Sequence, residues 1–138
     1  DFGPIADRFI KEGPARVGED YLRGPTRVQL LRKNPAAWKQ LFAEFGELSP
    51  IGMAYTLRGV QLRRPTMYEL EPGLRTLRVP TLVIVGEEDA PALVPSRFLA
   101  RTIPGPTLRV LPGTGHTVQL EEPHVFNDAV RQFVRSLG

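Results

Sequence analysis

Hydrophobic positions along the chain change their spacing near residue 78. Before that point, apolar residues recur every three or four positions in short segments that Pro and Gly separate, which is typical of helices. Two such segments cover residues 35–46 and 49–62. The apolar face of the first consists of Trp38, Leu41, Phe42 and Phe45. The pattern predicts short helices and no strand before residue 78.

The spacing after residue 78 is typical of strands that alternate with helices. Residues 79–86 (Val-Pro-Thr-Leu-Val-Ile-Val-Gly) are apolar and rich in β-branched side chains, as expected for a parallel strand covered on both faces. Residues 107–111 alternate partly, which predicts a second strand nearer a sheet edge. Ser96 is the expected N-cap of a helix that ends at Pro104-Gly105, and Pro123 is expected to open the last helix. This order predicts a parallel α/β sheet with helices on both faces.

Composition places the chain among ordinary globular domains and excludes several kinds of site. The sequence has 138 residues, of which 41% are hydrophobic and 24% charged, which permits a packed core and argues against disorder. It contains no cysteine, so disulfides, thiolate metal sites and a cysteine nucleophile are excluded. The two histidines, His116 and His124, cannot form a three-histidine metal site. We therefore expect neither a metal nor another cofactor.

The charge distribution and the absence of long apolar runs argue against a nucleic-acid partner and against a membrane partner. The net charge of +3 is spread thinly rather than gathered in a basic stripe with interleaved aromatics, so a nucleic-acid partner is not expected. No apolar run reaches the roughly 18 residues of a membrane span, and the opening Asp1-Phe2-Gly3-Pro4 is not typical of a signal peptide. These features favour a cytoplasmic protein with no membrane partner. The missing initiator Met suggests that the chain begins inside a longer product.

An acid and a histidine follow the two predicted strands directly. Residues 86–89 (Gly-Glu-Glu-Asp) follow the first strand, and residues 112–116 (Pro-Gly-Thr-Gly-His) follow the second. Because consecutive parallel strands end at the same edge of a sheet, Asp89 and His116 are expected to lie within hydrogen-bond reach. A carboxylate in that place can accept the imidazole Nδ1–H and stabilise the imidazolium, which leaves Nε2 free as a base.

Simpler interpretations of the same residues stay open. A Gly-x-x-Asp turn after a strand is often only an Asx turn, and Glu87 or Glu88 could replace Asp89 as the acid. His124 stands at a helix start and is interpreted as a surface residue. Three apolar residues of the helical half could line a substrate pocket, although packing in a helical core is the favoured interpretation; they are Trp38, Phe42 and Met53.

Together these residues resemble the closing third of α/β-hydrolase-fold enzymes. The resemblance rests on residues 79–89, Ile103-Pro104-Gly105, Gly115-His116, and Glu122-Pro123 with Phe126. In that family the triad acid follows the Gly-x-x-Asp turn and the triad histidine follows Gly in the last loop. The resemblance thus implies Asp89 as catalytic acid and His116 as catalytic base. It also implies that residues 1–75 are a helical cap (lid) segment and residues 76–138 the last two strands and helices of the α/β-hydrolase core.

The chain departs from the family pattern because it lacks a nucleophile. The family places a Ser, or an Asp in some branches, in a Gly-x-Ser-x-Gly type of turn before the acid. This sequence has no such turn upstream of Asp89, and the oxyanion loop and the earlier strands are absent as well. The resemblance therefore implies a C-terminal half, inactive alone, whose partner is an N-terminal half or a second copy of the chain.

Two classes of function follow from these observations. The resemblance implies a hydrolase of small, largely apolar substrates such as esters, lactones, epoxides, haloalkanes or C–C diketones. The other class is a non-catalytic scaffold or interaction fragment that keeps the fold without the activity. The missing nucleophile favours the second class for the isolated chain, whereas Asp89 and His116 favour the first for its parent protein.

Overall fold

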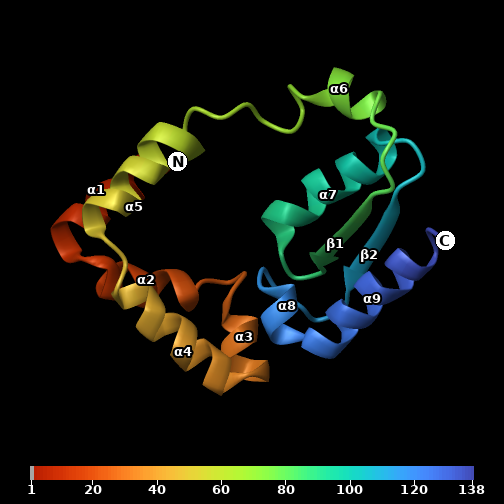
Figure 1. The fold of residues 1–138 in the computed structure, drawn as a ribbon. Helices are drawn as coiled ribbons and strands as arrows, with labels where there is room; N and C mark the ends of the chain where they lie inside the picture. Colours follow the sequence, from red (N-terminus) through yellow and green to blue (C-terminus); the bar gives the residue numbers. More distant parts are fainter. Residues whose placement is uncertain (1) are drawn as a thin grey trace. The chain divides into compact units, whose positions relative to one another are not determined.

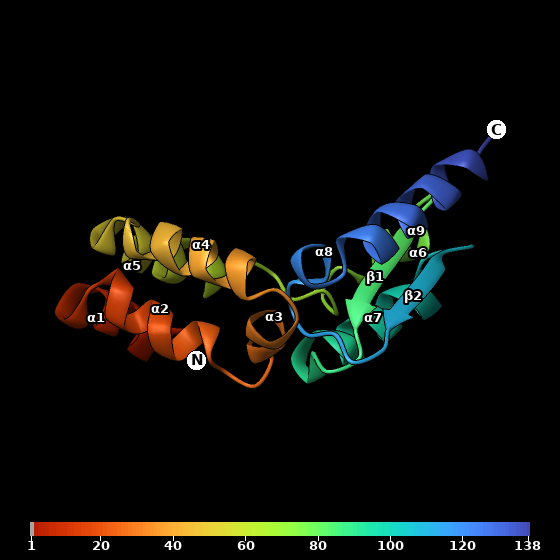
Figure 2. The same ribbon diagram turned by 90° about the horizontal axis from the view of Figure 1, so that it is seen from below.

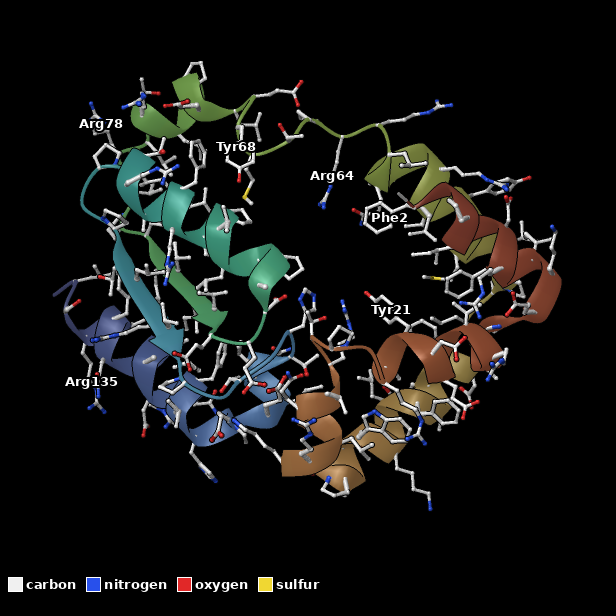
Figure 3. The ribbon with its side chains drawn as sticks, turned by 180° about the vertical axis from the view of Figure 1, so that it is seen from behind. Phe2, Tyr21, Arg64, Tyr68, Arg78 and Arg135 are labelled. Carbon is white, nitrogen blue, oxygen red and sulfur yellow. The ribbon has the colours of Figure 1, made fainter. Side chains whose placement is uncertain are left out.

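The computed structural model describes residues 2–138 and divides into two compact units, the first ending at Pro65 and the second beginning at Thr66. The cap and core segments that the resemblance implies, residues 1–75 and 76–138, are a different division and stay a prediction. Helix α6 (Glu71–Arg75) packs against helix α7 (Ala90–Thr102). Just before α6 lies Tyr68 (labelled in Figure 3). Its ring meets that of Phe98 edge-on, with 4.7 Å between centroids. These contacts attach the segment from Thr66 onward to the second unit.

The first unit is helical throughout, as its apolar spacing predicts (Figure 1). Its helices are α1 (Gly3–Glu12), α2 (Pro14–Leu22), α3 (Val28–Lys33), α4 (Pro35–Gly46) and α5 (Pro50–Thr56), followed by the π-helical turn η1 (Leu57–Gln61). Proline fits the first turn of a helix because the amide hydrogen it lacks has no partner there. The side chains of Asn34 and Ser49 accept hydrogen bonds from the amides of Ala37 and Gly52, each at 3.1 Å, and so cap α4 and α5. The helices predicted over residues 35–46 and 49–62 are confirmed.

The core of the first unit lies where α1, α2 and α5 meet. Its buried members are Ala6, Phe9, Val17, Ala54 and Leu57. The ring of Phe9, only 2% exposed, stacks on that of Phe45 from α4 with 5.9 Å between centroids. Aromatic burial of this kind holds short helices that would be marginal in isolation.

The second unit is built on two parallel strands. Strand β1 (Leu82–Gly86) pairs with β2 (Thr107–Leu111) in parallel, in a register that sets Gly86 opposite Leu111. Helix α7 connects the strands, and α8 (Val118–Glu121) and α9 (Pro123–Arg135) follow β2. Helices α7 and α9 lie on opposite faces of the strand pair (Figure 2). The predicted α/β class, with parallel strands connected by helices, is confirmed.

Three local predictions need correction. Strand β1 begins at Leu82 rather than Val79, because Pro80 has no amide to give to a sheet ladder. It is buried only at its carboxyl end, so the expected cover on both faces is incomplete among the described residues. Helix α7 begins at Ala90, directly after Asp89, so Ser96 lies inside the helix and is not its cap. A proline in its first turn favours the early start, and burial of Phe98 and Thr102 carries the helix past Pro95.

Candidate active site

The acid turn joins β1 to α7 and presents a buried carboxylate. The amide of Asp89 donates to the carbonyl of Gly86 at 3.2 Å, and the carbonyl of Asp89 accepts the amides of Ala92 and Leu93. Through its amide Asp89 closes the turn, and through its carbonyl it begins the helix. Its carboxylate is almost fully buried, with 5% of the side chain exposed.

The histidine loop follows β2 and is held against the acid turn by backbone hydrogen bonds. The amides of Glu87 and Glu88 donate to the carbonyls of Leu111 and Thr114, each at 2.9 Å. Because these bonds continue the pairing of β1 with β2, the two loops leave the sheet together at its carboxyl edge. The topology places an acid and a histidine side by side although they are distant in the sequence.

His116 and Asp89 are joined directly. The Nδ1 atom of His116 lies 2.7 Å from Oδ2 of Asp89, so the predicted hydrogen-bond contact is confirmed. The side chain of His116 is 46% exposed, whereas the carboxylate that it meets is buried. A neutral imidazole that donates its Nδ1–H to this carboxylate keeps the lone pair on Nε2, the atom that can take a proton.

The other two acids of the turn, Glu87 and Glu88, make different contacts. Oε2 of Glu87 accepts the amide of Gly113 at 3.2 Å and so supports the histidine loop, and Glu88 bonds that loop through its backbone amide. The structure therefore selects Asp89 from the three acids of the turn as the residue that contacts His116. Its catalytic role stays a prediction.

Glu121, in the short helix α8, is a site residue that the sequence reasoning missed. Its carboxylate is 5% exposed and accepts three hydrogen bonds: from the amide of Gly115 at 2.7 Å, and from the amide and the hydroxyl of Thr117 at 3.0 Å each. The spacing of Glu121 from Val118 could have indicated that it is buried. Residues three apart share a helix face, and Val118 is buried. An acid at an apolar register position predicts a buried carboxylate with dedicated donors.

Each of the three serines of the chain lies at the start, in the interior or at the end of a helix. Ser49 caps α5, Ser96 lies within α7, and the hydroxyl of Ser136 donates to the carbonyl of Phe133 at the end of α9. Among residues 2–138 no group of three or more His, Cys, Asp or Glu side chains is arranged to hold a metal ion. None of the helices in that range has both the length and the hydropathy of a membrane span.

Of the three apolar residues considered as pocket candidates, Met53 lines a hollow, whereas Trp38 and Phe42 pack against each other. An apolar hollow of about 80 Å³, open to solvent, lies within the first unit. Its lining residues are Phe2, Ile5, Phe9, Val17, Tyr21, Phe45, Met53 and Leu57. Of these, Phe2 and Tyr21 are the exposed ones, each at 39% (Figure 3).

Met53 is thus a pocket residue, whereas Trp38 and Phe42 pack on each other. Their rings stack with 5.3 Å between centroids, and the indole Nε1–H of Trp38 donates to the carbonyl of Leu22 at 3.3 Å. Trp38 is 8% exposed, so the favoured interpretation, core packing, holds for it. His124 is exposed at the start of α9, as expected for a surface residue.

Comparison with known proteins shows the family of the chain. The chain matches the alpha/beta hydrolase family over residues 2–129. It is similar to the structure of MenH from S. aureus (26% identity, TM-score 0.84, 95% of this chain and 48% of that one). It is also similar to a thermophilic esterase from Thermogutta terrifontis (28% identity, TM-score 0.82, 97% of this chain and 48% of that one).

A curated relative is also a hydrolase by name. A protein of Caulobacter sp. (strain K31) named as a carbamate hydrolase is 37% identical over 70 residues, which are 49% of this chain and 25% of that protein. The chain spans less than half of the solved relatives and a smaller share of this curated one. With the family matched over nearly its whole length, the chain belongs to the alpha/beta hydrolase family.

Proposed function

We propose that the protein containing this chain is a hydrolase in which His116 is the general base and Asp89 the residue that orients it. The observation that carries the proposal is the 2.7 Å contact between His116 Nδ1 and Asp89 Oδ2 at the carboxyl edge of the sheet. In such a pair, Nε2 removes a proton from a nucleophile or from water, and the carboxylate stabilises the imidazolium that forms.

The difference in exposure between the two side chains supports these roles. Asp89 is shielded from water, which strengthens its interaction with a positive charge on the imidazole. His116 keeps part of its ring accessible, as a group that exchanges protons with a substrate requires. A purely structural ion pair has no need of this asymmetry.

The substrate that we propose is small and largely apolar, with an ester, epoxide or related bond. The similarity to an esterase and to a protein named as a carbamate hydrolase supports hydrolysis of a carbonyl-containing bond. We propose that residues 1–75 are the cap segment of this cytoplasmic enzyme.

The nucleophile, a Ser or an Asp, is proposed to come from outside this chain. The sequence contains no Gly-x-Ser-x-Gly turn. The chain matches only about half the length of its solved relatives. The isolated chain is therefore proposed to be inactive, and its partner to be an N-terminal half or a second copy.

The test compares matched substitutions in the full-length protein with a 4-nitrophenyl ester as substrate. His116→Ala is expected to abolish nearly all turnover, whereas His124→Ala, at the exposed histidine of α9, is expected to leave it unchanged. Asp89→Asn is expected to lower kcat by about 10⁴-fold through the wrong imidazole tautomer, and Asp128→Asn to have no effect. Equal activity of wild type and His116→Ala would overturn the enzymatic proposal and leave a non-catalytic scaffold.

A further inference from the structure

The histidine loop is held at its backbone by one buried side chain. Glu121 accepts hydrogen bonds from the residue before His116 and from the residue after it, at 2.7–3.0 Å. Both oxygens are used: Oε2 by the Gly115 amide, and Oε1 by the amide and hydroxyl of Thr117. The backbone on both sides of His116 is therefore tied to a single carboxylate.

We infer that Glu121 is a positioning residue for His116, setting the direction from which the imidazole approaches Asp89. This inference deepens the proposed function and rests on it. A side chain leaves the backbone along its Cα–Cβ bond, and that direction is fixed once the peptide groups on both sides are fixed. Asp89 then holds the ring end of the same residue through Nδ1. The imidazole is thus restrained from both ends, which a proton-transfer group needs for productive geometry.

The chemistry of the site requires a carboxylate in this place. A buried carboxylate is costly unless donors satisfy it, and here three donors converge on it in a position only 5% exposed. A glutamine of the same size would turn its NH2 group toward one of these donors and lose that bond. An alanine would leave the Gly115 amide buried without its partner. Substitution therefore releases the loop even where the helix around it persists.

The first arm of the test measures the imidazole directly by NMR, with 15N-labelled histidine in the full-length protein, where the signals of His116 are those missing from His116→Ala. Exposed His124, assigned in the same way from His124→Ala, is the internal reference. At a pH well above the ordinary histidine pKa of about 6.5, wild type is expected to show His116 almost entirely as the Nδ1–H tautomer. Glu121→Gln is expected to lower that fraction to about half or less and to speed amide exchange at Gly115 and Thr117. Asp128→Asn, the same change of charge on exposed α9, is expected to change neither.

A second arm uses a milder substitution, so that the inference can be tested even if Glu121→Gln does not fold. Thr117→Val removes only the hydroxyl donor to Glu121, so it is expected to shift the tautomer in the same direction by a smaller amount. In the full-length protein, Glu121→Gln is expected to lower kcat by about 10- to 100-fold with KM little changed, as a misplaced base would.

The outcomes separate the two proposals. A wild-type Nδ1–H tautomer that persists in Glu121→Gln, or a Glu121→Gln enzyme with unchanged kcat, overturns the positioning role and leaves the proposed function standing. A wild-type His116 with no preference for Nδ1–H overturns the positioning role too. Because the tautomer is measured without substrate, failure of the proposed hydrolase activity is seen separately, in the His116→Ala comparison.

Discussion

Gly86 and Thr114 approach so closely that only a hydrogen fits between them. A Cβ atom on Gly86 would lie 2.2 Å from the carbonyl oxygen of Thr114 and the same distance from that of Gly115. Gly86 ends β1 and begins the acid turn, while Thr114, fully buried, belongs to the histidine loop. The absence of a side chain at residue 86 therefore lets the two loops pair and brings Asp89 to His116.

Gly86→Ala is expected to separate these loops. The atoms in the way are backbone, so the added methyl group must displace the histidine loop, at a cost of about 1–3 kcal/mol. Hydrogen–deuterium exchange at the amides of Glu87 and Glu88, which bond that loop, is expected to accelerate. Gly73→Ala in α6 is the matched control, because no heavy atom outside its chain neighbours and the backbone of its own helix lies within 4 Å of the added Cβ. Unchanged exchange in Gly86→Ala would contradict the close packing.

Phe9→Ala is expected to destabilise the first unit by about 3–5 kcal/mol. Phe9 is 2% exposed and stacks on Phe45, so its removal leaves a cavity in the core between helices. Trp38 is the chain's one tryptophan, and its fluorescence reports unfolding of this unit in urea. Ile10→Ala, at the next position but 49% exposed, is expected to change stability by no more than about 0.5 kcal/mol. Similar midpoints for the two variants would contradict the assigned core.

The ion pairs of Arg8 predict how stability depends on pH. Arg8 lies 2.7 Å from Glu12 and 2.6 Å from Asp20 of the next helix. Chiefly through these hydrogen bonds it lowers the pKa of both carboxyls below their ordinary values of 4.5 and 3.8. A lowered pKa in the folded state contributes stability above the ordinary values, and that contribution is lost as the pH falls through the lowered ones.

Urea titrations of wild type and Arg8→Gln are expected to differ most near neutral pH and to converge in acid. All three groups are exposed, so the difference is small and shrinks further when salt is added. A gap that widened below pH 4 would contradict the sign of this linkage.

The proposed companion half predicts that the purified chain does not behave as a well-packed monomer. In the part of the chain that the structure describes, β1 and β2 pair only with each other, and a two-stranded sheet is marginal by itself. Apolar side chains of α9, among them Val125 and Val134, are 48% and 59% exposed. Size-exclusion chromatography with light scattering is expected to show a dimer or aggregates. A cooperatively unfolding monomer of 15.4 kDa would contradict the prediction.

The sequence by itself determined the local elements and the two ends of the proposed catalytic contact. Helix 35–46, strand 107–111 and the helix start at Pro123 are as predicted, because hydrophobic period and proline chemistry act over a few neighbouring residues. Asp89 and His116 could be paired because a rule of topology, that parallel strands end at one edge, connects them without any knowledge of distances.

Only the tertiary structure decided which groups meet through space. Glu87, Glu88 and Asp89 have similar chemistry within one turn, and the selection of Asp89 depends on the path of the backbone after Gly86. The contact of Tyr68 with Phe98 attaches the segment before α6 to the second unit, and burial of Phe98 and Thr102 carries α7 past Pro95. Glu121 meets the amides of Gly115 and Thr117 because the four-residue helix α8 directs its carboxylate toward the histidine loop. Such contacts depend on distances between segments, and local periodicity holds no information about those distances.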